Sequence, residues 1–240
     1  MFEWLFERTR PDLSPELAAA VHAWRRLPAP RDAESLAAAR FVVVDTETTG
    51  LDPERAGLLS IGACEVSESV LHLGRVFESY VRPPAVSRAD NVLIHQIGHA
   101  AQRSAEPLTE SLAAWLSYAG KPVCVGFHAG FDAAILARHV RSALGARLST
   151  AWIDVRILLC GLFPSEADRA LDLDGWLSRF RIVIAARHSA VADALATAQL
   201  LLIALHHAEH RGVMTVRALR NFHDRTLRSL ASRSGESAGL

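Results

Sequence analysis

The clearest feature of the hydrophobic pattern is a β-branched apolar run, Phe41-Val-Val-Val44, followed by the polar stretch 45–50. A short apolar run with this boundary predicts a buried central strand. Two further strands are predicted at 58–66 and 73–81, joined by turns. Three consecutive strands favour an antiparallel meander at the start of the sheet.

The second half of the sequence alternates between helical and strand patterns. Together with the three first strands, this alternation predicts an α/β fold: a mixed five-stranded sheet with helices on both faces. The predicted elements are a helix at 109–118, a strand at 123–126, a helix at 131–144, a strand at 152–154, helices at 155–162 and 174–180, and a long amphipathic helix at 190–210.

The two ends of the chain are predicted to be helical additions to this sheet. Ser14-Pro15 supplies an N-cap and a proline at the first helical position, which predicts a helix that ends near Leu27. A short second helix is predicted at 33–39. The C-terminal end is rich in arginine and closes in Ser/Gly-rich residues, so it is either a solvated helix face or a nucleic-acid contact. The predicted divisions are a helical leader at 1–39, a main domain at 40–212 and a basic, partly frayed tail at 213–240.

Composition narrows the class of protein without identifying its partner. The chain has 240 residues, of which 50% are hydrophobic, so it can bury one large core. The formal net charge is zero, and there is no global signature of nucleic-acid binding. Three separated cysteines indicate a reducing compartment, and the longest apolar stretch, at 200–205, is too short to span a membrane. We therefore expect a soluble cytoplasmic protein with no membrane partner.

Two carboxylates directly follow the central strand. Asp45 and Glu47 are two residues apart, so on a strand both side chains point to the same face. Neighbouring like charges repel unless a cation lies between them, and hard ions such as Mg²⁺ prefer oxygen ligands. The alternative is an ordinary polar turn, where Asp, Thr and Gly are common.

Three more polar residues stand at predicted helix starts, and each alone has an ordinary explanation. Asp132 begins the helix at 131–144, where an acid is favoured by the helix dipole. Asp193 lies in the first turns of the long helix and His188 just before it. Four carboxylates and a histidine at element ends can nevertheless converge at one edge of an α/β sheet, where such proteins place their sites. Two other acids are predicted to cap helices, Asp154 at 155–162 and Asp174 at 174–180.

The order of these motifs resembles the DEDDh class of 3′–5′ exonucleases, the family of the DNA polymerase III epsilon proofreading subunit, ribonuclease T and oligoribonuclease. The resemblance rests on DTETTG at 45–50, the Phe131-Asp132 pair and the HxxxxD pattern from His188 to Asp193. Ile94-His95-Gln96-Ile97 also resembles a family segment. The resemblance covers residues 40–210 and implies a ribonuclease H-like fold.

The resemblance also implies a role for each residue. Asp45, Glu47, Asp132 and Asp193 would hold two Mg²⁺ or Mn²⁺ ions, and His188 would be the general base. Glu47 would lie beside the attacking water. Positions that surround the terminal nucleotide in the family are matched by Thr48, Leu51, His95 and Phe131.

The implied function is hydrolysis of single-stranded DNA from its 3′ end, releasing nucleoside monophosphates in proofreading or repair, with a polymerase or repair assembly as a further partner. Alternatives are a 3′–5′ exoribonuclease or oligoribonuclease, and a non-catalytic nucleic-acid-binding module of the same fold. The sequence departs from many relatives in having Phe127-His128 where they have His-Asn. This change bears on substrate preference.

Overall fold

The sheet is the centre of the computed structural model, which describes residues 11–82, 105–167, 169–184, 187 and 189–237. Its order is β3-β2-β1-β4-β5. β2 pairs antiparallel with both β1 and β3, whereas β4 pairs parallel with both β1 and β5. The predicted mixed five-stranded sheet is therefore confirmed. The strands are β1 (Phe41–Thr48), β2 (Leu58–Ser67), β3 (Val70–Tyr80), β4 (Val123–Gly126) and β5 (Ala151–Asp154).

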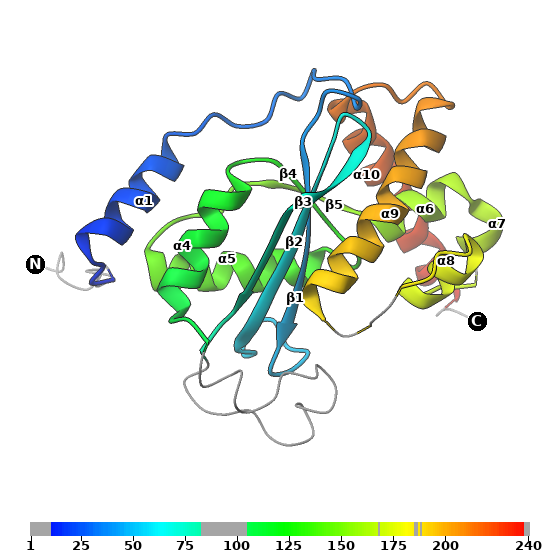
Figure 1. Ribbon diagram of the computed structural model, residues 1–240. Helices are drawn as coiled ribbons and strands as arrows, with labels where there is room; N and C mark the ends of the chain where they lie inside the picture. Colours follow the sequence, from blue (N-terminus) through cyan, green and yellow to red (C-terminus); the bar gives the residue numbers. More distant parts are fainter. Residues whose placement is uncertain (1–10, 83–104, 168, 185–186, 188, 238–240) are drawn as a thin grey trace, which may run out of the picture.

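Helices cover both faces of the sheet, as Figure 1 shows. Val42 and Val44 of β1 point into one core cluster and Phe41 and Val43 into the other, because successive side chains on a strand face opposite ways. On the first face lie α1 (Pro15–Arg25), α4 (Leu108–Ala119) and α5 (Gly130–Leu144). On the second lie α6 (Val155–Leu162), α7 (Pro164–Ala167), α8 (Leu173–Arg179), α9 (Ala190–Glu209) and α10 (Val216–Ser237).

The described part of the leader packs on this domain. The Ser14 hydroxyl accepts from the Leu17 backbone N–H at 3.3 Å, which confirms the predicted cap of α1. The helix predicted at 33–39 is wrong, because this backbone pairs with the segment before α10. The Leu36 N–H donates to the Met214 carbonyl at 3.0 Å, and an isolated bridge joins Ser35 to Thr215.

The segment predicted as a basic tail is largely the helix α10, which packs against α6. Its first turns belong to the core, since Val216 and Leu219 are fully buried. The arginines of this segment therefore project from a helix whose apolar side is covered, and the start of that helix is integral to the domain.

The long helix α9 crosses the sheet at very short range. A Cβ added at Gly62 of β2 would lie 2.1 Å from both the Ala190 carbonyl carbon and the Val191 nitrogen, so only glycine permits this approach. α9 has the length and apolarity of a membrane span, but 56% of its most apolar window is buried. Its contacts with β1 and β2 are those of a core helix.

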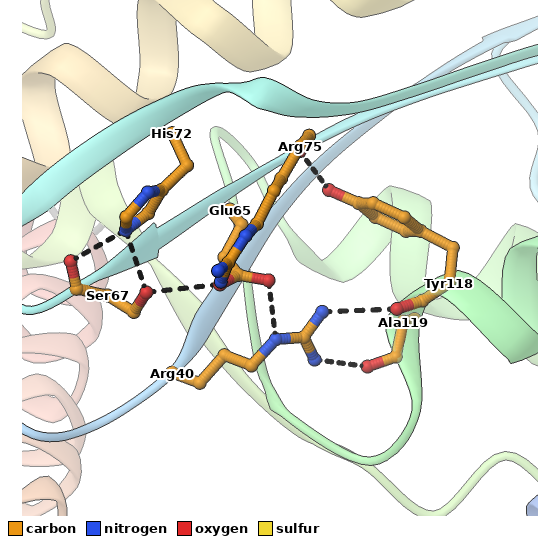
Figure 2. Close-up of polar contacts among 7 residues, drawn as sticks. All are labelled: Arg40, Glu65, Ser67, His72, Arg75, Tyr118 and Ala119. Atoms are coloured by element: carbon orange, nitrogen blue, oxygen red, sulfur yellow. Dashed lines mark hydrogen bonds and ion pairs between the residues drawn. The ribbon is translucent and has the colours of Figure 1, made fainter.

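A network of ion pairs and hydrogen bonds connects the sheet to the C-terminal end of α4 (Figure 2). The Glu65 side chain is only 5% exposed and is bonded by Arg40 at 2.7 Å and by Arg75 at 2.5 Å. The Arg40 guanidinium also donates to the carbonyls of Ala119 and Tyr118, which end α4. One buried carboxylate thus orients an arginine that satisfies carbonyls left open at a helix end.

These contacts control the ionisation of Glu65. Burial alone would raise its pKa, but the hydrogen bonds from Arg40 and Arg75 outweigh burial and hold the pKa below its usual value. A carboxyl with a lowered folded-state pKa stabilises the fold above its unfolded pKa, and the stabilisation is lost as pH falls through the folded pKa.

We expect Arg40→Ala to lower the free energy of unfolding by about 2–3 kcal/mol at pH 7, because it leaves the buried Glu65 with one charged partner and opens two carbonyls of α4. Urea unfolding measures this loss. The difference between the variant and the wild type should shrink in acid, as Glu65 becomes protonated in both.

Arg75→Ala is the matched control. Its side chain is 61% exposed, so its ion pair is screened and its removal should lower stability by less than about 1 kcal/mol. Equal losses in the two variants would contradict a special role for Arg40.

Candidate functional site

The site begins at the carboxyl end of β1, which is paired on both sides. Asp45 and Glu47 stand opposite Gly62 and Ser60 of β2, and the first half of β1 pairs with β4. Both side chains are half-buried and project from the face that α9 covers. The predicted juxtaposition of these two carboxylates is therefore present.

Asp193 joins them from the first turn of α9, where it is buried. Carboxylate oxygens of Asp45, Glu47 and Asp193 lie within 4.8 Å of one another. Two of these residues come from one strand and the third from a distant helix. The close approach of α9 to Gly62 is what brings the third to the other two.

Asp132 approaches the group from α5 and is also buried. Its Oδ1 accepts a hydrogen bond from the Thr46 hydroxyl at 2.7 Å, so Asp132 is bonded to the residue between Asp45 and Glu47. The structure thus brings all four predicted carboxylates to one edge of the sheet, with Asp132 beside the tight group of three.

The turn before α5 depends on His128. This residue has a φ of 58°, and its backbone N–H donates to Asp154 Oδ1 at 3.3 Å. Its carbonyl accepts from the Phe131 N–H at 3.0 Å. The Phe127-His128 pair that distinguishes this sequence therefore forms the turn that leads to Asp132.

Burial and mutual repulsion keep Asp45, Glu47 and Asp132 from ionising freely. Burial first, and then the charges of Asp132, Asp193 and Glu47, hold the pKa of Asp45 well above its ordinary value. Burial, with the charges of Asp193 and Asp132, raises the pKa of Glu47 to about 7. Burial likewise raises the pKa of Asp132 to about 7, although the Thr46 hydrogen bond opposes the shift.

Arg187 is a residue of this site that the sequence analysis did not identify. Its guanidinium bonds Asp193 and also Asp174 of α8, the latter at 2.6 Å. Its charge lowers the pKa values of Asp45 and Glu47 against the larger raising effects. Its position directly before His188 and the last motif was the available signal.

The predicted nucleotide-binding positions differ in exposure. Leu51 is 93% exposed at the loop between β1 and β2, which the Thr49 and Gly57 backbones close at 2.9 Å. Phe131 is half-buried against the core, and the Thr48 hydroxyl donates to the Gly50 carbonyl at 2.7 Å. His188 and His95 lie outside the described residues, so their roles stay predictions.

The competing acids have structural roles. Asp154 caps α6 by accepting from the Arg156 N–H at 2.9 Å, as predicted. The cap of α8 is Asp172, which accepts from the Gly175 N–H at 2.8 Å, and not Asp174. Asp174 is inside the helix, which begins one residue earlier than predicted, and is therefore available to Arg187.

The chemistry of the donor set fits a hard divalent cation. Asp45 and Glu47 resist ionisation because they are buried and lie near other carboxylates, and a cation placed among the three clustered acids would offset that repulsion. Asp45, Glu47 and Asp193 can hold such an ion, and Asp132 lies beside them.

Related proteins carry names from DNA replication. The chain is 31% identical over 170 residues to a DNA polymerase III subunit epsilon from Rickettsia felis, covering 67% of this chain and 71% of that protein. It is 29% identical over 180 residues to a DNA polymerase III subunit epsilon-like protein from Rhodobacter capsulatus, covering 75% of this chain and 25% of that protein. The chain thus spans only a quarter of the length of the second relative.

Solved structures share the fold. Exonuclease X in complex with 5′-overhanging duplex DNA superposes with a TM-score of 0.57 at 20% identity, over 76% of this chain and 99% of that one. Escherichia coli exonuclease I in complex with a dT13 oligonucleotide superposes with a TM-score of 0.59 at 19% identity, over 72% of this chain and 42% of that one.

The family assignment comes from the sequence itself. Residues 42–201 match the RNase T family, whose description is "Exonuclease". This span includes β1 with its two carboxylates, the start of α5 and most of α9. The four clustered acids therefore lie within the matched region, and the chain belongs to the RNase T family of exonucleases.

Proposed function

We propose that this chain is a two-metal-ion 3′–5′ exonuclease that removes nucleoside monophosphates from single-stranded DNA. The observation that carries the proposal is the cluster of Asp45, Glu47 and Asp193, with oxygens within 4.8 Å of one another and Asp132 beside them. A nuclease with this donor set requires divalent cations, for which Mg²⁺ or Mn²⁺ fits the all-oxygen ligands.

The four carboxylates would hold two ions. Asp45, Glu47 and Asp193 would hold one ion, and Asp45 with Asp132 would hold the second. When bound, the ions supply positive charge to the attacking and leaving oxygens and lower the pKa of water. Glu47 orients the attacking water, and His188 accepts its proton.

The exposed apolar tip at Leu51 supports a role in holding the strand end. The Leu51 side chain is 93% exposed in the loop that follows β1, the strand that carries Asp45 and Glu47, and it offers an apolar surface to the face of a nucleobase. The loop that carries it is tied to α5 by Arg138, whose Nε donates to the Pro53 carbonyl at 2.8 Å. Thr48, Phe131 and His95 would contact the same nucleotide.

DNA is the favoured substrate because of the relatives. Those at 29% and 31% identity are named for DNA polymerase III epsilon, and the exonuclease I structure holds a dT13 oligonucleotide. By the same reasoning, a polymerase or repair assembly is the proposed partner. RNA is the main alternative, because the catalytic carboxylates act on the phosphate and do not distinguish the two sugars.

The deciding experiment compares 5′-labelled single-stranded DNA, duplex DNA with a mismatched 3′ end and a short RNA, each with Mg²⁺ or Mn²⁺. We expect stepwise shortening of the DNA single strand from its 3′ end, and loss of all activity with EDTA. His188→Ala should slow turnover about 10²–10⁴-fold if it is the general base.

Faster shortening of RNA than DNA would support the exoribonuclease alternative. Absence of nucleotide release from every substrate would support a non-catalytic binding module. Near-wild-type turnover of His188→Ala from pH 6 to 9 would contradict the general-base assignment alone.

Measuring the stability of the protein without substrate tests the metal site independently of nuclease activity. The Glu47 and Asp132 pKa values near 7 exceed those of unfolded carboxyls, so the metal-free fold should lose stability as pH rises from about 5 to 8. Mn²⁺ at about 100-fold above its Kd should add about 2.7 kcal/mol at pH 8. Differential scanning fluorimetry measures both effects.

Asp45→Asn removes one repelling charge, so it should raise the metal-free melting temperature at pH 8 while reducing the Mn²⁺-dependent rise. A Mn²⁺ response equal to that of the wild type would place the ion elsewhere and contradict the proposed site.

Gly62→Ala tests whether the approach of α9 sets the ligand geometry. The added Cβ would clash with the Ala190–Val191 backbone, so α9 must move and carry Asp193 away from Asp45. We expect turnover to fall about 10²-fold, with a weaker Mn²⁺ response and a retained circular dichroism spectrum.

Gly74→Ala is the matched control, because a Cβ on this glycine of β3 meets nothing within 4 Å. It should leave turnover unchanged. Wild-type turnover in Gly62→Ala would show that the helix tolerates the shift and that Gly62 does not position the site.

A further inference from the structure

A pair of histidines stands at the far end of α9, away from the carboxylates. His206 and His210 are four residues apart, so their side chains share one face of the helix end, and both are exposed. Their Nε2 atoms are 3.2 Å apart, with ring centroids 4.4 Å apart and rings nearly perpendicular at 82°. A hydrogen bond between the two rings requires one nitrogen to donate and the other to accept.

The separation of the two nitrogens fits a shared metal ion. With metal–nitrogen bonds of about 2.0–2.1 Å, two nitrogens at this separation subtend an angle of about 100° at the metal. This angle lies between those of square-planar and tetrahedral coordination.

The end of the helix backbone favours a cation at this position. The last turn of a helix presents carbonyl dipoles whose negative ends point outward, and these stabilise positive charge. The neighbouring guanidinium of Arg211 is turned to α6, where it donates to the carbonyls of Gly161 and Leu162. The ring of His207 lies 4.8 Å from that of Phe163 and 5.6 Å from that of His206, and its nitrogens make no hydrogen bond with either histidine of the pair in the part of the chain that the structure describes.

The ligand type separates this pair from the carboxylate site. Imidazole nitrogens suit Zn²⁺, Ni²⁺ or Cu²⁺, whereas carboxylate oxygens suit Mg²⁺ or Mn²⁺. From Asp193 to His206 is about 20 Å along the helix axis, at about 1.5 Å per residue, so the two sites share no ligand. Figure 1 shows this end of α9, in orange, next to the connection to α10.

We propose that His206 and His210 form a second metal site, specific for a borderline transition-metal ion such as Zn²⁺, with water completing the coordination. The ion clamps the last turn of α9, from which the chain turns through Gly212 at φ 78° toward α10. Because the last turn of a helix frays readily, a bound ion stabilises the corner between α9 and α10.

The test is a titration of the full-length protein with Zn²⁺ by isothermal calorimetry, in buffer with saturating Mg²⁺. We expect His206→Ala and His210→Ala each to weaken one Zn²⁺-binding event at least about 10-fold, while Mg²⁺-dependent nuclease activity without zinc stays at the wild-type level. Cu²⁺ bound in place of Zn²⁺ should show an electron paramagnetic resonance signal with splitting from two imidazole nitrogens in the wild type.

His207→Ala is the matched control, since this exposed histidine lies on the same turn but outside the pair. It should retain the binding event. Zinc uptake by the His206→Ala/His210→Ala double variant equal to that of the wild type would overturn the proposal, as would equal loss in His207→Ala.

Discussion

The repulsion among Asp45, Glu47 and Asp193 is the constraint that the rest of the structure must satisfy. Their oxygens lie within 4.8 Å of one another, and burial, together with the charges of Asp193 and Asp132, raises the pKa of Glu47 to about 7. Such a group persists only on a rigid support, because flexible side chains would separate. β1 provides that support, since β2 pairs along its whole length and β4 along its first half. A divalent cation placed between these carboxylates would relieve the same repulsion.

The distance between the sheet and α9 is the second part of this support. Asp193 reaches the other two acids because Gly62, which pairs with Asp45, has no side chain to hold α9 away. A glycine inside a strand otherwise weakens it. Here the loss is offset by apolar packing, since α9 buries alanines and leucines against β1 and β2. The contact between α9 and the sheet therefore both packs the core and places Asp193 in the site.

Much of the fold could be predicted because its signals are local. The apolar run at 41–44 and the alternation after residue 108 identify strands and helices from neighbouring residues alone. The four acids were found because each stands at the end of such an element. The failed helix at 33–39 has a non-local cause: its backbone pairs with residues before α10, and no local pattern encodes that pairing. The Thr46–Asp132 hydrogen bond and the role of Arg187 are non-local in the same way, since each joins separate elements.

The guanidinium of Arg187 offsets only part of the negative charge of the clustered acids. It contacts Asp193 among the clustered acids, and its single charge lowers the pKa values of Asp45 and Glu47 without bringing them to their ordinary range. Its second bond, to Asp174, ties the segment before α9 to α8. A guanidinium donates hydrogen bonds in one plane, whereas a divalent ion accepts oxygen ligands from several directions. Arg187 can therefore fix the position of Asp193 while the repulsion between Asp45 and Glu47 remains largely uncompensated. The remaining repulsion is the physical reason that a divalent cation fits this group of acids.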